Sequence, residues 1–267
     1  MTGPAVADAS GRFGFDCSQD DFLGGRLSIT QPRKGHRSGI EAVLIAAATP
    51  LAAGETVLDI GSGVGVAGLC ALSRVAGARA VLVEADADLA ALAAENARRN
   101  GFAVAGADAS VDVHALDVTE RGAIGALGLD GAVDHAVANP PFYDPAASRT
   151  SPAKSAAHAA PADLLDAWIR FAARAVRPGG TLTLVHRAEA VSLVLQGFGR
   201  RFGGVTILPV HPRPGAAATR ILVQGRKASR APVAILPGLV LHGRQGHGFL
   251  PEVEAVLRTG AKLEMTR

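Results

Sequence analysis

The sequence predicts an α/β fold, with a Rossmann-like, seven-stranded, mostly parallel sheet and helices on both of its faces. Strand-like and helix-like segments alternate from about residue 55 to residue 224, which is typical of right-handed βαβ units. Apolar residues make up 48% of the 267 residues and charged residues 19%, so the chain can bury a substantial core. A glycine-rich segment at residues 61–65 follows the first strand of the alternation, where sheets of this class bind ligands.

The alternation begins with a strand over Thr56–Ile60 and an apolar helix over Val66–Val75. A second buried strand is predicted over Ala80–Glu84, and a helix over Asp86–Asn100 follows it. Acidic residues open that helix and two Arg residues close it, which suits the helix dipole. Gly101 comes directly after it, as a C-terminal cap requires.

The alternation continues in the second half of the chain. Apolar residues recur at helical spacing over Asp163–Val176, which predicts a helix. Pro178-Gly179-Gly180 is expected to separate this helix from the next strand. The remaining strands are predicted over Val111–Leu116, His135–Ala138, Thr181–His186, Val205–Val210 and Thr219–Gln224. Residues 144–162, rich in Ala, Ser and Pro, are too many for an ordinary connection, which predicts a mobile functional loop.

The first fifty residues are predicted to form an extension of this domain. A hairpin is expected around Gly24-Gly25, followed by a helix over Ala42–Ala48. Ser38 and Glu41 match the S-x-x-E capping box, in which the two side chains close the first turn of a helix. The predicted organisation is therefore residues 1–50 as a hairpin and helix extension and residues 51–267 as the main domain.

The composition excludes several classes of protein. Two cysteines, Cys17 and Cys70, exclude a disulfide scaffold and favour reduced thiols in the cytoplasm. Residues 1–10 lack the pattern of a secretory signal. The sequence contains no run of about 20 apolar residues, so no membrane span is expected. It also lacks clustered Cys and His pairs, so no metal is expected. The net charge of +3 and the pI of about 9.2 permit a nucleic-acid partner without requiring one.

The glycine-rich segment indicates a cofactor site. Asp59, Gly61, Ser62, Gly63 and Gly65 lie in a D-x-G-x-G-x-G pattern between the first strand and its helix. Glycines let the backbone approach a ligand closely. Residues 63–68 also match G-x-G-x-x-G, so a dinucleotide is an alternative ligand, and a plain tight turn is another reading. The longer pattern resembles motif I of S-adenosylmethionine-dependent methyltransferases. That resemblance implies that Asp59 and the loop hold the amino-acid end of the cofactor.

Two carboxylates follow the next two strands. Glu84 ends the second strand, where a carboxylate can accept two hydrogen bonds from a ribose diol. Asp117 follows the third strand, and the methyltransferase pattern implies that a residue at this place binds the adenine amino group. Each also has a simpler interpretation, because acids often open helices and Asp often stabilises turns.

The fourth strand ends in the tetrad Asn139-Pro140-Pro141-Phe142, which resembles the N-P-P-[YF] motif of methyltransferases acting on nitrogen attached to a planar, conjugated system. The lone pair of such an amine is delocalised, so the amine is a poor nucleophile. The Asn139 side-chain oxygen and the Pro140 carbonyl can accept its hydrogens and free the lone pair. Pro141 helps to fix the backbone, and Phe142 can stack on the flat substrate. Asn139 is also expected to border the cofactor. The alternative is a simple Pro-Pro turn.

The N-terminal segment extends the resemblance to one family. Residues 22–27, Gln31-Pro32 and residues 35–39 are similar to the start of the tRNA adenine-N6 methyltransferases that act next to the anticodon of a valine tRNA. This resemblance implies methyl transfer to an exocyclic amine, with RNA, most simply a tRNA, as the partner. Glu41 stands where that family usually has Asp, and Phe142 where Tyr is frequent. The alternatives are glutamine N5 of a protein, guanine N2 of ribosomal RNA, or a non-catalytic cofactor-binding subunit.

Basic residues flank the expected site. Arg33, Lys34, His36 and Arg37 follow the predicted hairpin, and Arg149, Lys154 and His158 lie in the long segment past the tetrad. A cationic rim beside a base pocket suits RNA phosphates, although single basic residues usually belong to a solvated face.

Overall fold

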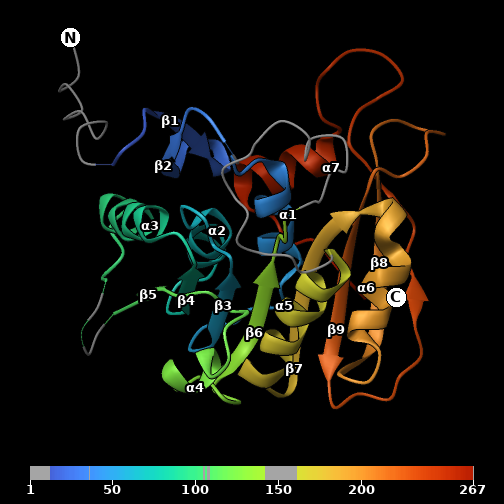
Figure 1. The fold of residues 1–267 in the computed structure, drawn as a ribbon. Coiled ribbons are helices and arrows are strands. Elements are labelled where there is room, and N and C mark those ends of the chain that lie inside the picture. Colours follow the sequence, from blue (N-terminus) through green and yellow to red (C-terminus); the bar gives the residue numbers. More distant parts are fainter. Residues whose placement is uncertain (1–12, 36, 105, 107–108, 142–160, 267) are drawn as a thin grey trace, which may run out of the picture.

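The computed structural model describes residues 13–35, 37–104, 106, 109–141 and 161–266. A central sheet carries helices on both faces, and a separate two-stranded hairpin lies above one end of it (Figure 1). The hairpin pairs β1 (Cys17–Phe22) with β2 (Leu27–Pro32) in antiparallel register. The main strands are β3 (Thr56–Ile60), β4 (Arg79–Glu84), β5 (Val111–Ala115), β6 (Val133–Ala138), β7 (Val176–Arg187), β8 (Phe202–His211) and β9 (Arg220–Lys227).

The order of these strands across the sheet is β8-β9-β7-β6-β3-β4-β5. Neighbours from β7 to β5 pair in parallel, and β9 runs antiparallel to both β7 and β8. Two further strands of two residues each, β10 (Ala234–Ile235) and β11 (Leu239–Val240), pair in parallel with β8 and cover that edge. The predicted seven-stranded, mostly parallel sheet is therefore confirmed, with two short strands added to it.

Two hydrophobic clusters fill the space between the sheet and its helices. The helices are α1 (Ile40–Ala48), α2 (Val66–Arg74), α3 (Ala87–Arg99), α4 (Ala123–Ala126), α5 (Pro161–Ala175), α6 (Val191–Phe198) and α7 (Pro251–Glu254). One cluster joins α1, α2, α3 and the hairpin to one face of the sheet, and the other joins α4, α5 and α6 to the opposite face. Helices α4 and α6 were not predicted from the sequence.

The third helix shows how local sequence sets an element. The Asp86 side chain accepts hydrogen bonds from the backbone N–H groups of Asp88 and Leu89, at 3.0 and 3.2 Å, which caps the first turn of α3. At the other end, Gly101 takes a φ of 80°, and the chain turns away. Both ends of this helix were predicted correctly.

Strand β7 differs from its prediction. Residues 178–180 were expected to break the chain, but the strand begins at Val176 and runs through them. The register of β7 against β6 shifts between Val133 and His135. A side chain at Gly180 would place its Cβ 2.1 Å from the Asp134 carbonyl oxygen. The glycine at 180 therefore permits close approach of two backbones. Residues 177–180 interrupt the pairing of β7 with β6, as expected, but they do not end the strand.

The predicted capping box at α1 is also wrong. The N-cap of α1 is Gly39, and no side chain caps the helix there. The Ser38 backbone instead exchanges two hydrogen bonds with the Gln31 side chain, at 2.9 and 3.3 Å. Glu41 forms an ion pair of 3.5 Å with Arg220 at the start of β9. A long-range contact has thus replaced the local one.

The hairpin and α1 bury their apolar side chains in the same cluster as α2 and α3. The sequence boundary near residue 50 stays a prediction. Nearly all of the long segment 144–162 lies outside the described residues. In the part of the chain that the structure covers, none of the helices has the length and apolar character needed to cross a membrane.

Candidate active site

Strand register brings the predicted site residues to one edge of the sheet. Ile60, the last residue of β3, pairs with Val83 of β4 on one side and with Ala138 of β6 on the other. Gly61 therefore lies between Glu84 and Asn139. Adjacent strands are about 4.8 Å apart, so the glycine loop, the carboxylate and the tetrad border one short stretch of this edge. The Leu116 N–H donates a hydrogen bond of 2.8 Å to the Glu84 carbonyl. Asp117, the next residue, therefore lies at the same edge of the sheet.

The glycine loop is shaped for a ligand. Gly61, Gly63 and Gly65 all have positive φ, at 63°, 55° and 89°, a conformation that other residues rarely adopt. A Cβ at Gly63 would meet no atom within 4 Å. The Ser62 hydroxyl oxygen is buried and has no hydrogen-bond partner among the described residues. A buried polar atom of this kind normally has a partner, and a bound cofactor beside the loop would supply one.

Asp59, near the end of β3, contacts the helix that follows the glycine loop. Its side chain is buried, and one carboxylate oxygen accepts a hydrogen bond of 2.8 Å from the Gly68 N–H in the first turn of α2. Burial raises the pKa of this carboxyl to about 7, the Gly68 bond opposes the rise, and the charge of Glu84 adds to it. Asp59 thus fixes the start of α2 behind the loop. Its direct contact with the cofactor remains a prediction.

The raised pKa of Asp59 predicts a pH-dependent stability. A group whose folded pKa lies above its unfolded value binds its proton more tightly in the folded state. Its contribution to stability is therefore complete below about pH 4 and is lost as the pH rises through about 7. Asp59→Asn keeps an oxygen for the Gly68 N–H and removes the titration. We expect its midpoint of urea unfolding to decline less than that of the wild type between pH 5 and 8. Parallel declines would contradict this assignment.

Glu84 braces the loop from the neighbouring strand. One carboxylate oxygen accepts a hydrogen bond of 2.8 Å from the Gly63 N–H, and the other accepts one of 3.0 Å from the Asp86 N–H. A carboxylate has about four acceptor positions, so two remain for a ribose diol. Asp117 accepts hydrogen bonds from the Thr119 N–H and hydroxyl, at 2.8 and 2.7 Å. The turn role of Asp117 is therefore present, and its adenine contact remains a prediction.

Trp168, the only tryptophan of the chain, supports the loop from the other side. It is half-buried on α5 and packs against the hydrophobic cluster that joins α4, α5 and α6 to the sheet. A Cβ at Gly61 would lie 2.0 Å from the tip of its indole ring, at Cη2. The ring therefore lies against the Gly61 backbone, and α5 contacts the glycine loop directly.

The tetrad contains a buried acceptor without a hydrogen-bond partner among the described residues. Asn139 is half-buried, and its side-chain oxygen is fully buried without a hydrogen-bond partner among the described residues. Pro140 is buried and Pro141 is exposed. Phe142 lies outside the residues that the structure describes. The first residue of the tetrad thus carries an acceptor that lacks a donor, next to the glycine loop.

The basic residues before α1 divide into two kinds. Arg33 and Lys34 are exposed, and their contact with RNA phosphates stays a prediction. Arg37 donates hydrogen bonds to the Ser18 hydroxyl at 2.7 Å and the Pro32 carbonyl at 3.0 Å, and it forms an ion pair of 2.5 Å with Asp20. Its guanidinium is thus engaged in tying this segment to the hairpin. His36, Arg149, Lys154 and His158 lie outside the described residues.

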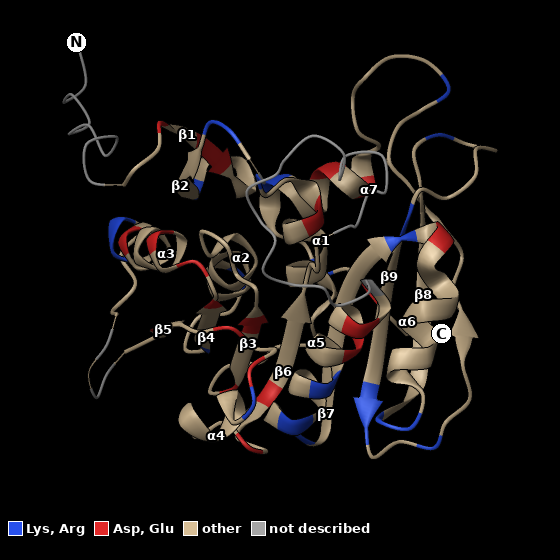
Figure 2. Ribbon diagram, viewed as in Figure 1, with Lys and Arg blue, Asp and Glu red and all other residues tan. Residues whose placement is uncertain are grey.

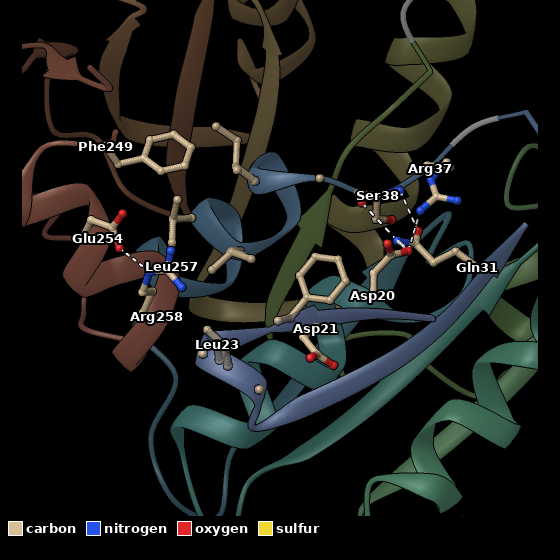
Figure 3. A pocket seen from close by; sticks show the side chains of 16 residues that line it. Asp20, Asp21, Leu23, Gln31, Arg37, Ser38, Phe249, Glu254, Leu257 and Arg258 are labelled. Atoms are coloured by element: carbon tan, nitrogen blue, oxygen red, sulfur yellow. Dashed lines mark hydrogen bonds and ion pairs between the residues drawn. The ribbon is translucent and has the colours of Figure 1, made fainter. Parts of the chain in front are cut away.

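A cavity of about 540 Å³ opens between the hairpin tip, α1 and α7 (Figure 3). The bonded group of Asp20, Gln31 and Arg37 forms one wall, and Phe249 and the Glu254–Arg258 ion pair face it. Among the residues that the structure describes, which exclude Phe142, none of the predicted cofactor or tetrad residues lines this cavity. It is therefore distinct from the strand-edge site built by Gly61, Glu84 and Asn139.

Sequence reasoning missed Asn96, which lies in the middle of α3. This side chain is fully buried and exchanges hydrogen bonds of 2.9 and 3.0 Å with the backbone of Thr30 in β2. Its amide also donates to the carbonyl of Val64, inside the glycine loop, at 3.1 Å. Asn is a poor residue for a helix interior, and that mismatch was the available signal. Asn96 links the hairpin to the glycine loop.

Asn100 offers a matched control for that link. It exchanges two hydrogen bonds of 2.9 Å with the Ser28 backbone but does not touch the loop. We expect Asn96→Ala to raise the Kd for S-adenosylmethionine about tenfold more than Asn100→Ala does, since a buried hydrogen bond contributes about 1 kcal/mol or more. Calorimetry at matched folded fractions measures this. Equal effects on the Kd would mean that Asn96 serves only the hairpin.

Comparison with known proteins agrees with this geometry. The family model described as the methyltransferase small domain matches residues 41–208. A tRNA1(Val) (adenine(37)-N6)-methyltransferase of Serratia proteamaculans is 28% identical over 181 residues, which cover 67% of this chain and 66% of the relative. The match thus spans slightly less than two thirds of that relative.

Two solved structures share the fold. A predicted O-methyltransferase from Agrobacterium tumefaciens has a TM-score of 0.68 and 29% identity, over 84% of this chain and 98% of its own. A 16S rRNA N2 G1207 methyltransferase from T. thermophilus, solved with AdoMet and guanosine, has a TM-score of 0.53 and 20% identity, over 79% of this chain and 50% of its own.

The open space beside Gly63 and the unpartnered Ser62 hydroxyl fit a bound cofactor at the strand edge. The family model covers well over half of the chain and includes the glycine loop and the first three residues of the tetrad within its bounds. The chain therefore belongs to the methyltransferase small domain family, and it is an S-adenosylmethionine-dependent methyltransferase.

Proposed function

We propose that the protein methylates an exocyclic amine of RNA, and that its substrate is adenine N6 in a tRNA, next to the anticodon. The buried side-chain oxygen of Asn139, which lacks a partner among the described residues, carries this proposal. The cofactor supplies an electrophilic methyl group. The residues of this chain must then bind a weakly nucleophilic amine and make its lone pair available.

Two acceptors suit an amine with two hydrogens. The Asn139 oxygen accepts one N–H, and the Pro140 carbonyl accepts the other. Both draw the nitrogen away from the planar geometry in which its lone pair is shared with the ring. Because the two prolines restrict the backbone, the acceptors are held in place before the substrate binds. The methylated amine is acidic and releases its proton readily, so this arrangement requires no strong base.

The same arrangement favours nitrogen over oxygen as the methylated atom. A hydroxyl group brings one hydrogen and would leave one of the two acceptors unsatisfied, which costs free energy in a buried site. The Agrobacterium relative is described as a predicted O-methyltransferase, so this difference is worth testing directly. The Serratia relative is described as an adenine-N6 enzyme, which supports the amine.

RNA is favoured as the partner by the exposed pair Arg33 and Lys34 after the hairpin and by the description of the Serratia relative as a tRNA enzyme. A base within a stack cannot present its amine to the site, so the target must be flipped out or unpaired. An anticodon loop is already single-stranded and meets this need at low cost.

The experiment is a labelling assay. The purified protein is incubated with methyl-labelled S-adenosylmethionine and a cell extract, and portions are then digested with ribonuclease or with protease. We expect ribonuclease to release the label, and mass spectrometry of the labelled nucleosides to identify N6-methyladenosine in the tRNA fraction.

Other outcomes would replace the proposal. Label that survives ribonuclease and is lost with protease would indicate a protein substrate, with glutamine N5 as the target. Label in N2-methylguanosine of ribosomal RNA would indicate the guanine alternative. Label in a ribose or other hydroxyl group would contradict the assignment of the two acceptors to an amine.

A further inference from the structure

We propose that two loops at the substrate side of the active site, residues 212–219 and 241–250, form one cationic surface that holds the RNA backbone. This inference rests on the proposed RNA substrate and assigns it a contact surface beyond Arg33 and Lys34. We call these two segments the paired loops.

The sequence of this region carries charge of one sign. No Asp or Glu occurs between Glu189 and Glu252. Within that span, the paired loops carry Arg213 and Arg244 as their only charged side chains besides histidines, and Figure 2 shows basic segments on both loops. A long stretch with basic residues and no acidic ones favours a polyanionic partner.

The topology places both loops at the edge of the sheet that carries the candidate active site. Strand β8 runs parallel to β7, because both are antiparallel to β9. The end of β8 at His211 therefore lies at the same edge as the end of β6, where the tetrad begins. Strand β11 pairs Leu239 and Val240 with Val210 and His211, so the second loop leaves the sheet at that edge too. Figure 1 shows both loops projecting beyond the strands there.

The paired loops are also fixed to each other. Arg213 donates hydrogen bonds to the carbonyls of Gly243 and Gly246, at 2.6 and 2.8 Å. The His242 N–H donates to the Pro212 carbonyl at 3.1 Å. The His242 ring stacks on Phe249, with centroids 4.7 Å apart. A surface whose shape is set before binding loses less conformational entropy when it binds.

The Arg213 guanidinium is thus bonded to the second loop, whereas the Arg244 side chain is exposed to solvent. Arg244 is exposed, and it makes no hydrogen bond or ion pair with any residue that the structure describes. It can therefore contact a phosphate without breaking an existing interaction. Arg213 acts as the positioning residue that holds the loop carrying Arg244.

The test compares Arg244→Ala with Arg230→Ala. Arg230 is equally exposed and lies in the same acid-free stretch, but it follows the far end of β9, at the opposite edge of the sheet. Binding of total tRNA is measured from about 50 to 300 mM salt. One phosphate contact adds about 0.7 to the slope of log affinity against log salt for unpaired RNA. At about 100 mM salt that slope corresponds to a loss of about fivefold in affinity for Arg244→Ala.

We expect Arg244→Ala to flatten the salt dependence by about 0.7, Arg244→Lys to retain it, and Arg230→Ala to match the wild type. Affinity for S-adenosylmethionine should be unchanged in all three. Equal salt slopes for wild type and Arg244→Ala would overturn the paired-loop surface while leaving the RNA substrate intact. Failure of the wild type itself to bind RNA, with label appearing in protein, would instead overturn the proposed function.

Discussion

Replacing Asn139 with Ala is expected to lower kcat by about 100-fold or more while leaving the affinity for S-adenosylmethionine nearly unchanged. The Asn139 oxygen is assigned to the substrate amine, and it should bind more strongly as the nitrogen gains positive charge in the transition state. The loss should therefore appear in kcat with labelled tRNA as substrate, and calorimetry should report an unaltered Kd for the cofactor.

The stability of this variant separates a catalytic role from a structural one. The side-chain oxygen of Asn139 is buried and has no partner among the described residues, so deleting it removes no hydrogen bond that the structure shows. We expect the midpoint of thermal unfolding without ligand to stay the same or rise, because a buried unpaired acceptor costs free energy. A variant that unfolds early and keeps full turnover would show that the tetrad is structural.

Ser62→Ala is the matched control for Asn139→Ala. Its hydroxyl oxygen is likewise buried without a partner among the described residues, but it lies in the glycine loop, which is predicted to hold the cofactor. We expect this variant to raise the KM for S-adenosylmethionine and to leave kcat nearly intact. Asn139→Ala should thus change kcat and Ser62→Ala the KM for the cofactor, although both delete a buried polar atom at the same edge of the sheet.

The strand pattern made the site predictable from sequence. Ligands of parallel sheets bind beyond the carboxyl ends of the strands, so Glu84 and Asn139 could be expected to lie beside the glycine loop from their positions alone. The pairing of Ile60 with Val83 and Ala138 places them there. Local signals such as the Asp86 cap were equally informative, because both partners lie within one helical turn.

Contacts between distant segments could not be predicted in this way. Ser38 and Glu41 match a capping box, yet Gln31 and Arg220 take their places as partners. Arg37 reads as a free cation, but Asp20 lies 2.5 Å from its guanidinium. In each case, a contact with a residue in or at the end of a strand takes the place of the expected local role. A single sequence does not reveal which strand will lie near a given residue.

Trp168 belongs to the same class of contact. Its position on an apolar helix predicts a core residue, and the structure does pack it on a hydrophobic cluster. The contact of its ring with Gly61 depends on how α5 lies against the end of β3, which periodicity does not specify. That contact makes Gly61 the most constrained glycine of the glycine loop, residues 61–65.

Gly61→Ala is accordingly expected to destabilise the protein by about 3 kcal/mol and to weaken cofactor binding by at least tenfold. The left-handed backbone at φ 63° costs about 1–2 kcal/mol for a residue with a Cβ. The added Cβ would also lie 2.0 Å from the Trp168 ring, so the half-buried indole must shift and lose contacts. Urea unfolding measures the stability, and the fluorescence of the single tryptophan reports the shift.

Gly63→Ala isolates the contribution of the ring. Gly63 has a similar φ of 55°, but a Cβ there meets no atom within 4 Å. Gly63→Ala should therefore lower the free energy of unfolding by about 1–2 kcal/mol, the backbone cost alone. The added methyl group would still fill the space expected for the cofactor. In the Gly61→Ala background, Trp168→Ala should recover part of the lost stability, whereas in the Gly63→Ala background it should only destabilise further. Equal destabilisation by the two glycine substitutions, with no recovery, would show that Trp168 does not constrain the loop.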